Sequence, residues 1–540
     1  MRAIERVLVE MARSERPLLQ VLDSQGAQAL CLSYRQVIGS AQALAARLSS
    51  ALPAARLRAA ELPRIGVACA NSPGFVVADL ACLIARVTEV PVPLAFSASQ
   101  AAGLLDGVDV CLVDVDGERR LAEWGPDILG EGAVIIRVNG DPWLPTVLPS
   151  RADGSSATED WVCKIIHTSG TTSLPKGVRI RAQGLDALLC SLCSQMPREA
   201  FTRYLSTVPL SLLIEQVTAL YMVLLQRGML TLLPQQTALI GTTAGAARAM
   251  LPLLKAAQPT ALVATPALVE ELRQEAEAAI AAGLAISDAI FGTRDVPLIC
   301  CGGAPIDPGV LHHLDRMGVP VYEGYGLSEN GSVVSWNRPG ARKVGSVGRP
   351  LPHVRVSVAA DGELLVSSSS LFAGYTRTDP SSCVVDEEGW LHTGDLARLD
   401  DEGFVYITGR KKDVIITSSG RNVAPEWVEA QHATLPFVRA VAVTGNRLPV
   451  LSGLFLVAPG TDLLRARAEI EEFGTAHLSE VERVQSARVL EASDQLYRQF
   501  FTVTGRPQRS LIEAALLSQP SATAFANPAA TTGEPGVGHA

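Results

Sequence analysis

Small residues, hydroxyl groups and a lysine are concentrated between positions 168 and 177, a combination suited to holding a polyphosphate. Small residues let the backbone approach phosphate oxygens, hydroxyl and amide groups donate hydrogen bonds, and the lysine adds a positive charge. The run follows the apolar segment 162–167, which we predict to be a strand. A flexible linker is the simplest alternative, but the preceding strand and the closing Pro-Lys-Gly favour a phosphate loop. The expected phosphate contacts are Thr168, Ser169, Gly170, Thr171, Thr172 and Lys176.

This loop is not of the Walker type, because that pattern requires G-x-x-x-x-G-K-[ST] and Lys176 here precedes Gly177. It resembles the signature loop of the adenylate-forming superfamily, which includes acyl-CoA synthetases, nonribosomal peptide adenylation domains and firefly luciferase. The family usually has glycine at Ser173, a small departure since serine also fits a hydroxyl-rich loop. The resemblance covers about residues 15 to 512. It implies a ligase that uses ATP and Mg²⁺ to convert a carboxylic acid to an acyl-AMP and then transfers the acyl group to a thiol.

Further motifs of the superfamily follow in the expected order. The run Tyr325–Glu329 resembles the second core motif, with Ser328 in place of the usual threonine. By resemblance, Ser328 contacts the α-phosphate and Glu329 binds Mg²⁺, a hard cation that commonly takes one carboxylate plus phosphate oxygens. The remaining nucleotide contacts implied here are Gly302, Gly303, Ala304 and Pro305, packed on adenine, and Tyr325 with Gly326 on its other side.

Two further runs resemble the ribose motif and the interdomain hinge. Asp395 ends the run 389–395, and by resemblance its carboxylate accepts hydrogen bonds from both ribose hydroxyls. In the run 409–413, Arg410 would contact ribose and Lys412 would be the hinge residue. Taken alone, an Asp after Gly is usually a turn residue and Arg-Lys-Lys-Asp a solvated charge run, so both assignments depend on the resemblance.

The C-terminal motifs contain the largest departure from the family pattern. Residues 419–425 and Glu429 resemble the loop and helix that line the thiol tunnel after domain rotation, which assigns Gly420 to that tunnel. The last family motif places a lysine that bridges carboxylate and phosphate where this chain has Arg506. Arginine keeps the charge but is bulkier and less compact. Three alternatives remain: Arg506 replaces the lysine, adenylation is slower, or another residue serves. We favour replacement.

The segment Pro209–Glu215 indicates which acid is used, since it resembles long-chain acyl-CoA synthetases, which usually carry His at Leu212. Amino-acid-activating relatives place an Asp at Leu210, and leucine cannot pair with an ammonium group. Ser211 and Leu212 are therefore expected to line an acyl tunnel, where each buried CH₂ contributes about 0.8 kcal/mol. The alternative is that residues 212–214 are ordinary core.

These observations favour a medium- or long-chain fatty acid ligase, with CoA or a phosphopantetheinyl carrier protein as the acceptor. Activation of an aryl or other small acid is the first rival. A non-catalytic nucleotide-binding homologue is the second, and only Ser173 and Arg506 support it.

The elements that must position these motifs alternate apolar strand-like runs with helical stretches, which predicts an α/β fold. Leu298–Cys301 is expected to be a strand, followed by a helix with Asp307 as its cap and Pro308 in its first turn. A second strand starts at Val319, and the glycines of 324–326 are expected to break it. The two strands should be parallel, so both glycine loops lie at carboxyl ends, where open α/β sheets bind ligands.

The pattern changes after about residue 340. Leu396–Leu399 and Phe404–Ile407 flank an acidic turn and predict a hairpin. We expect a large N-terminal domain, residues 1–411, with mostly parallel sheets flanked by helices, and a small α+β C-terminal domain, residues 412–516, on a hinge. Residues 517–540 are rich in Ala, Pro, Gly, Ser and Thr and are expected to be disordered.

Composition limits the partners. The formal net charge of −9 argues against a nucleic-acid partner, which would require a basic patch. The N-terminus has no signal-peptide core, and no apolar run reaches the about 18 residues of a membrane span, which predicts a cytoplasmic protein. Cys190 and Cys193 could form a redox or metal pair, but without a second pair we favour two small residues one helical turn apart.

Overall fold

The computed structural model divides the chain into two compact units. Unit 1 contains residues 1–413 and 502–506, and unit 2 contains 414–501 and 507–540. Both combine helices with sheets, and the two larger sheets of unit 1 are mainly parallel, which confirms the predicted α/β class. The described residues are 1–52, 62–130, 132–138, 160–168, 176–235, 237, 239, 246–303, 306–377, 382–418, 422–446, 448–502, 505 and 507–517. The predicted disordered tail lies, from residue 518 on, outside them.

A six-stranded sheet carries the hairpin that flanks the predicted phosphate loop. Its order is β6-β5-β3-β4-β7-β8, and all neighbours are parallel except β7 and β8. Thr168 at the end of β7 pairs with Lys176 at the start of β8, so the strand expected before the loop is confirmed. The strands are β3 (Arg64–Ala68), β4 (Thr88–Pro91), β5 (Val110–Val113), β6 (Val134–Arg137), β7 (Val162–Thr168) and β8 (Lys176–Arg181).

Helices cover both faces of this sheet. Cys111 and Val113 of β5 share a core with α4 and α5, whereas Val110 and Leu112 share a different core with α2 and α3. This alternation follows from the strand period of two, and it explains why the strand is apolar throughout. The helices of this region are α1 (Arg2–Met11), α2 (Tyr34–Ala51), α3 (Pro73–Ala85), α4 (Ala98–Leu105), α5 (Val115–Trp124) and α6 (Ala182–Gln195).

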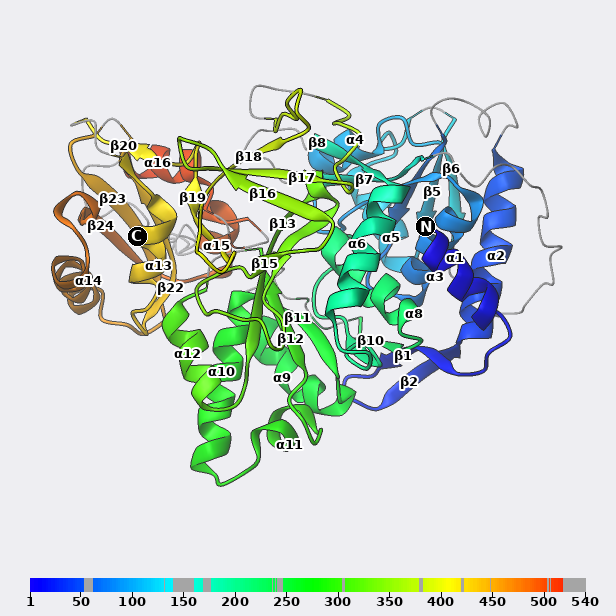
Figure 1. Cartoon of the computed structure of the whole chain (residues 1–540), viewed down its shortest axis with the longest axis horizontal. Helices are drawn as coiled ribbons and strands as arrows, with labels where there is room; N and C mark the ends of the chain where they lie inside the picture. Colours follow the sequence, from blue (N-terminus) through cyan, green and yellow to red (C-terminus); the bar gives the residue numbers. More distant parts are fainter. Residues whose placement is uncertain are drawn as a thin grey trace, which may run out of the picture. The chain divides into compact units, whose positions relative to one another are not determined.

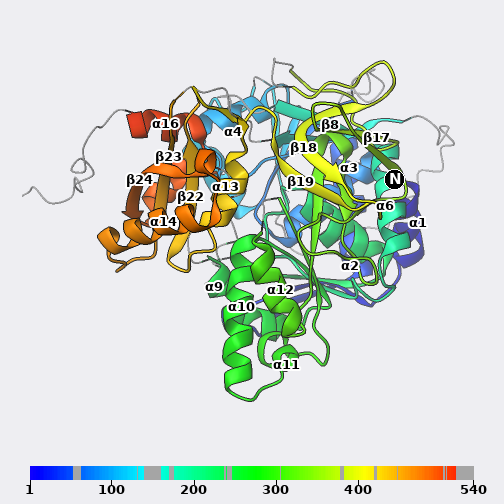
Figure 2. The same ribbon diagram turned by 60° about the vertical axis from the view of Figure 1, so that its left-hand side comes forward.

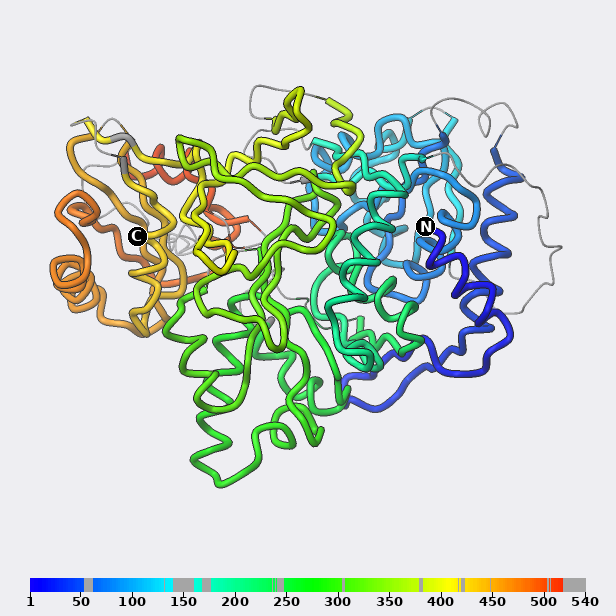
Figure 3. The backbone as a smooth tube through the Cα atoms, in the orientation of Figure 1, coloured from blue at the N-terminus to red at the C-terminus, as the bar shows by residue number. Residues whose placement is uncertain are grey.

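A nine-stranded sheet carries the predicted adenine loop and the second core motif. Its order is β15-β14-β13-β12-β11-β9-β10-β1-β2, and the six strands from β13 to β1 are parallel. The N-terminal strands β1 and β2, blue in Figure 3, form one edge of this sheet, with β1 beside β10. The strands are β1 (Pro17–Leu22), β2 (Gln28–Ser33), β9 (Arg203–Leu205), β10 (Met229–Leu232), β11 (Ala261–Ala264), β12 (Leu298–Gly302), β13 (Val321–Leu327), β14 (Ser332–Trp336) and β15 (Arg349–Pro350).

Four helices pack on one face of the β11–β13 part of this sheet (Figures 1 and 2). They are α9 (Ala246–Ala257), α10 (Pro266–Ala281), α11 (Ile286–Phe291) and α12 (Pro308–Arg316). The expected βαβ unit is confirmed: Asp307 caps α12 by accepting a hydrogen bond from the Gly309 amide at 2.8 Å, and β12 and β13 are parallel.

The prediction that the glycines of 324–326 end the second strand was wrong. β13 continues to Leu327 and pairs with the antiparallel strand β14. A Cβ at Gly326 would lie 1.8 Å from the carbonyl oxygen of Ser332, so this glycine permits a close approach of two backbones within the sheet.

The chain between β9 and β10 contains a seven-residue π-helix, η2 (Gln216–Met222), between two single helical turns, α7 (Leu213–Glu215) and α8 (Val223–Leu225). Every residue of η2 is buried. π-helical segments are rare and often mark functional regions. This one directly follows the segment 209–215 that was expected to contact the acyl chain.

A four-stranded antiparallel sheet completes unit 1, in the order β16-β17-β18-β19. The expected hairpin around residues 400–403 is confirmed, since Leu399 pairs with Val405. The strands are β16 (Val354–Val358), β17 (Glu363–Ser368), β18 (Leu391–Leu399) and β19 (Val405–Arg410), and the 3₁₀ turn η3 (Ser328–Asn330) lies between β13 and β14.

Unit 2 has a three-stranded sheet, β22-β23-β24, and a two-stranded one, β20-β21. Its elements are β20 (Ile415–Ile416), β21 (Asn422–Val423), α13 (Pro425–His432), β22 (Val438–Thr444), β23 (Leu451–Val457), α14 (Leu463–His477), η4 (Glu480–Glu482), β24 (Val484–Glu491), α15 (Asp494–Phe500) and α16 (Arg509–Leu517). Across the described part of both units, none of the helices combines the length and apolarity that crossing a bilayer requires.

Candidate active site

Lys176 is the first residue of β8 and lies at the exit of the predicted phosphate loop. Its side chain is 8% exposed. The ammonium donates a hydrogen bond to Ser382 Oγ at 3.3 Å and lies 5.9 Å from the ring centre of Tyr375. The hairpin register places this cation opposite Thr168, where a polyphosphate held by the loop would need it.

Glu329 lies in the turn η3 directly after β13, at the end of the nine-stranded sheet where the predicted ligand would bind. The Tyr375 hydroxyl donates to Glu329 Oε1 at 2.7 Å and accepts a hydrogen bond from the Cys383 amide at 3.1 Å. Burial raises the pKa of Tyr375 far above its ordinary value, and the charge of Glu329 raises it further. The phenol therefore stays protonated, and it brings Glu329 and Lys176 together on one side chain.

The residues predicted to contact ribose also lie close together. Asp395 is 4% exposed and sits opposite Arg410 in the β18–β19 pair, with Arg410 Nε 2.9 Å from Asp395 Oδ1. The Tyr325 hydroxyl donates to Asp395 Oδ2 at 2.5 Å. Burial, with the Asp395 charge, raises the pKa of Tyr325 well above its ordinary value. The Asp395 carboxylate thus contacts Arg410 and Tyr325, two residues of the predicted nucleotide site. A ribose diol bound here would share the Asp395 oxygens with them.

The glycines of the predicted adenine loop lie at the end of β12. Gly302 pairs with Gly324 of β13, and a Cβ at Gly302 would lie 2.8 Å from the Gly324 carbonyl oxygen. Gly303 has φ +86°, which favours glycine, and among the described residues a Cβ there would meet no atom within 4 Å. The backbone at Gly303, at the end of β12, therefore leaves open space that fits the approach of a flat base, and we call this place the glycine cradle.

Magnesium fits the donor set at this site, because Glu329 offers carboxylate oxygens, and Mg²⁺ is commonly bound by one carboxylate and substrate phosphates. Ser328 directly precedes Glu329 in the same turn. Several expected contacts lie outside the described residues, and for Thr168 only the backbone is described. The residues outside are Ser169, Gly170, Thr171, Thr172, Ala304, Pro305, Gly420 and Arg506.

A buried charged cluster is centred on Lys164, in the first strand of the β7–β8 hairpin. Lys164 of β7 is completely buried and contacts two carboxylates, Asp79 at 2.5 Å and Glu89. The Tyr221 hydroxyl of η2 donates to both Asp79 oxygens at 2.9 and 2.8 Å, and the Gln216 amide lies 3.5 Å from Glu89. The cluster therefore ties α3, β4 and η2 to the strand that leads into the phosphate loop.

The residues predicted to line the acyl tunnel lie before the π-helix. Ser211 and Leu212 are partly buried, and the Leu212 carbonyl accepts hydrogen bonds from the amides of Glu215 at 3.0 Å and Gln216 at 3.1 Å. Leu210 is completely buried, and its amide donates to Asn71 at 2.7 Å. A segment of this kind presents no side-chain charge at position 210.

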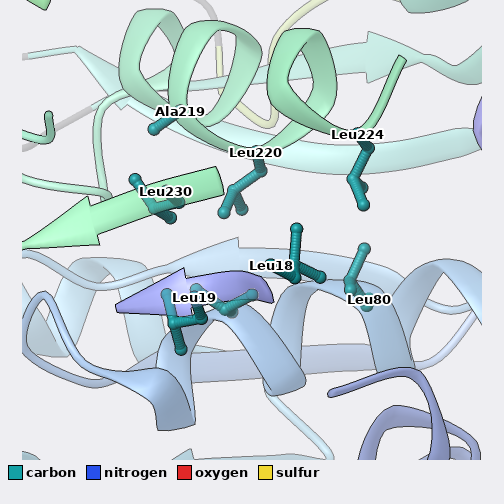
Figure 4. Close-up of a pocket in the computed structure, with 8 residues that line it drawn as sticks. Leu18, Leu19, Leu80, Ala219, Leu220, Leu224 and Leu230 are labelled. Carbon is teal, nitrogen blue, oxygen red and sulfur yellow. The ribbon is translucent and has the colours of Figure 1, made fainter. Parts of the chain in front are cut away.

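A small pocket elsewhere in unit 1 is entirely aliphatic (Figure 4). In the figure Leu220 and Leu224 point towards Leu18 and Leu80 across it. A wall without polar groups offers nothing to orient a carboxylate or phosphate, and it contains neither Ser211 nor Leu212. Its lining is Leu18, Leu19, Val76, Leu80, Ala219, Leu220, Leu224 and Leu230.

Lys412 is exposed in the turn after β19, one residue before unit 1 ends at Asp413. Within unit 2, Glu429 is 8% exposed and accepts hydrogen bonds from the Val443 amide at 2.7 Å and from Arg509 Nη2 at 2.9 Å. This carboxylate therefore ties α13 to β22 and α16. The hinge and tunnel roles stay predictions.

Sequence reasoning missed Tyr375 and Ser382. Tyr375 is 46 positions from its partner Glu329, and Ser382 is 206 from Lys176. Neither residue belongs to a local pattern with a chemical reason, so no spacing signal could have found them.

The chain matches a family model and several known proteins. The family model described as AMP-binding enzyme matches residues 24–376. The long-chain-fatty-acid–CoA ligase FadD15 of Mycobacterium bovis is 39% identical over 158 residues, which are 29% of this chain and 26% of that protein. The human long-chain-fatty-acid–CoA ligase ACSBG1 is 37% identical over 160 residues, 28% of this chain and 22% of that protein. The matched segment thus spans about a quarter of the length of these relatives.

Solved structures share the fold over nearly the whole chain. The O-succinylbenzoate coenzyme A synthetase of Bacillus subtilis, in complex with ATP and a magnesium ion, superposes with a TM-score of 0.71 at 20% identity. The match covers 94% of this chain and 99% of that one. At this identity the likeness shows the fold alone.

Proposed function

Since the chain belongs to the AMP-binding enzyme family, we propose that it uses ATP to activate a medium- or long-chain fatty acid as an acyl-AMP and then transfers the acyl group to a thiol. The observation that carries this proposal is the meeting of Lys176 and Glu329 on Tyr375, at the ends of the two sheets that bear the predicted phosphate and adenine loops. The names of the relatives, long-chain-fatty-acid–CoA ligases, support the choice of acid.

In the first step a carboxylate oxygen attacks the α-phosphorus of ATP in line, and the bond to the β-phosphate breaks to release pyrophosphate. Two anions must approach each other, so positioning and charge neutralisation account for most of the catalysis. Lys176 would neutralise phosphate charge, Ser328 would contact the α-phosphate, and Arg506 would hold the carboxylate. Magnesium bound at Glu329 would supply further positive charge at the phosphates.

The residues predicted to contact ribose and the glycine cradle would orient the nucleotide. Asp395 and Arg410 would contact the ribose, while Tyr325 and Gly326 would lie on one side of adenine. Gly302 and its neighbours up to Pro305 would lie on the other side. This division leaves the loop from Thr168 to Thr172 for the phosphates.

In the second step a thiolate attacks the acyl carbonyl, and the bond to AMP breaks. The acceptor would be CoA or the phosphopantetheine arm of a carrier protein. We propose that the C-terminal domain, residues 412–516, rotates about Lys412 to bring the Gly420 loop to the thiol tunnel, since such domain motions can gate successive steps. The N-terminal domain, residues 1–411, would stay with the nucleotide.

Leucine at positions 210 and 212 favours an apolar acid over an amino acid. Leu210 is buried, and an ammonium group there would lack a counter-charge. An aryl or other small acid is the second candidate, and the name of the B. subtilis structure, an O-succinylbenzoate coenzyme A synthetase, favours keeping it.

The test is ATP-dependent pyrophosphate release with saturated acids from acetate to palmitate, with Mg²⁺ and no acceptor, while hydroxylamine traps acyl-AMP. A maximum at a medium or long chain supports the proposal. A maximum at acetate, or release only when benzoates are supplied in place of the saturated acids, would replace the fatty acid by the small-acid candidate. Absence of release with every acid, combined with tight ATP binding, would favour a non-catalytic nucleotide-binding protein.

A further inference from the structure

Residues 368–376, here called the bridging segment, connect the strand that begins with Lys176 to the turn that contains Glu329. On one side the segment runs along the outer edge of β8, where Tyr375 forms an antiparallel bridge with Val178. Three backbone hydrogen bonds hold it there: Ala373 N to Arg179 O at 2.8 Å, Arg179 N to Gly374 O at 3.0 Å, and Thr376 N to Gly177 O at 2.8 Å.

The same segment is bonded to two consecutive residues of η3. The Phe372 amide donates to the carbonyl oxygen of Glu329 at 2.9 Å. The next residue, Asn330, is completely buried, and its side-chain oxygen accepts hydrogen bonds from Ser370 Oγ at 3.2 Å and from Ser368 Oγ. Backbone and side-chain bonds thus fix the turn against the segment.

Ser370 extends this network away from the site. His353 Nε2 lies 2.9 Å from Ser370 Oγ, and His353 Nδ1 lies 2.7 Å from Ser191 Oγ on α6. Because α6 directly follows β8, the network links the strand that begins with Lys176, through α6, to the turn that contains Glu329. The bridging segment is therefore braced from both directions.

Tyr375 is the residue of this segment that reaches both charges. Its hydroxyl donates to Glu329 Oε1, its ring lies under the Lys176 ammonium, and the edge of Phe372 packs against it with ring centres 4.8 Å apart. Carboxylate oxygens each accept more than one contact, so the phenol can orient Glu329 and still leave lone pairs for a metal. A carboxylate and an ammonium that are fixed before the ligand arrives need no reorganisation during the reaction.

We propose that Tyr375 is a positioning residue for adenylation, which holds the Glu329 carboxylate and the Lys176 ammonium at a set separation so that magnesium and the phosphates meet both. The inference rests on the proposed function, because it assigns Glu329 to magnesium and Lys176 to phosphate. It adds Tyr375, which contacts neither magnesium nor phosphate itself. Tyr375 acts through Glu329 and Lys176, which do.

The direct test is Tyr375→Phe, which keeps the ring under Lys176 and removes only the hydroxyl. We expect the Mg²⁺ concentration for half-maximal acyl-AMP formation to rise about tenfold, in the range seen when a group that orients a metal ligand is lost. The KM for the fatty acid should stay unchanged. Tyr375→Leu also removes the ring, and we expect it to raise the KM for ATP in addition.

Tyr221→Phe is the matched control, because its hydroxyl also donates to a carboxylate, but to Asp79 of the Lys164 cluster and not to Glu329. This variant should leave the Mg²⁺ dependence unchanged even if it lowers thermal stability. If Tyr375→Phe and Tyr221→Phe lose stability and kcat alike, with no shift in the Mg²⁺ dependence of either, Tyr375 is merely structural and the proposal is overturned.

Calorimetric titration of ATP at several Mg²⁺ concentrations separates this proposal from the proposed function. It requires no turnover, so it applies even if no acid is activated. About tenfold weaker Mg²⁺-dependent ATP binding in Tyr375→Phe supports the positioning role, and equal binding by wild type and variant contradicts it. Failure of the wild type to make acyl-AMP would count against the function alone.

Discussion

Replacing Glu89 by glutamine should change how the stability of this protein depends on pH. Glu89 and Asp79 both contact Lys164 of β7 in a completely buried cluster. One lysine neutralises only one of two buried carboxylates, so the remaining negative charge favours the protonated form of Glu89. Burial, with the charge of Asp79, raises the pKa of Glu89 to about 8, from 4.5 in a model compound.

The size of the effect follows from these two pKa values. A carboxyl whose pKa is raised by folding stabilises the folded state fully at pH below about 4.5, and this contribution is lost as pH rises towards 8. Between pH 5.5 and 8.5, the loss amounts to about 3 kcal/mol. Glutamine mimics the protonated carboxyl in shape and cannot ionise, so the variant should not show this loss.

The assay is urea unfolding of wild type and Glu89→Gln at pH 5.5 and 8.5, with amide hydrogen exchange of β4 and β7 as a local measure of opening. Glu89→Gln should gain about 3 kcal/mol relative to wild type between the two pH values. Glu123→Gln, at an exposed glutamate paired with Arg120, is the control and should follow wild type. Equal losses in Glu89→Gln and wild type would refute the idea that Glu89 is protonated at neutral pH.

Three further predictions concern the proposed reaction. Glu329→Gln should lower acyl-AMP formation at least about 100-fold at limiting Mg²⁺, because a neutral amide is a poor ligand for a hard cation; normal turnover in a pyrophosphate-release assay would remove Glu329 from the site. Lys412→Pro should spare acyl-AMP formation and impair thioester formation, since only the second step needs the domain rotation; equal loss in the two half-reactions, measured separately, would contradict the hinge. Arg506→Lys should retain or increase adenylation, as lysine is the usual family residue and keeps the charge; a loss above about tenfold in kcat would mean that this chain requires the guanidinium fork.

The parts of the fold that could be predicted have local causes. Asp307 and Pro308 predict a helix start, because aspartate can cap a helix and proline fixes a backbone angle that suits its first turn. The structure places α12 there. The glycines of 324–326 were misjudged because a glycine that ends a strand and one that allows two backbones to approach look alike in a sequence. Only the position of β14 beside β13 distinguishes them.

The candidate site divides in the same way. Glu329 and Asp395 stand in runs that match a family pattern, so they could be named before any contact was known. The partners that orient them are distant in sequence: Tyr375 is 46 positions from Glu329, and Tyr325 is 70 from Asp395. The buried Lys164 had no local signal either, since its charge is tolerated only because Asp79 and Glu89 arrive from other elements.

The bridging segment has a second consequence, for association between copies of the chain. β8 is the last strand of the six-stranded sheet, and an uncovered strand at such a position can recruit a strand from another molecule. Residues 373–376 occupy that edge with their own backbone hydrogen bonds. A change that detaches them would expose a template for intermolecular pairing, so its first visible effect in concentrated solution would be aggregation on warming, before any general loss of secondary structure.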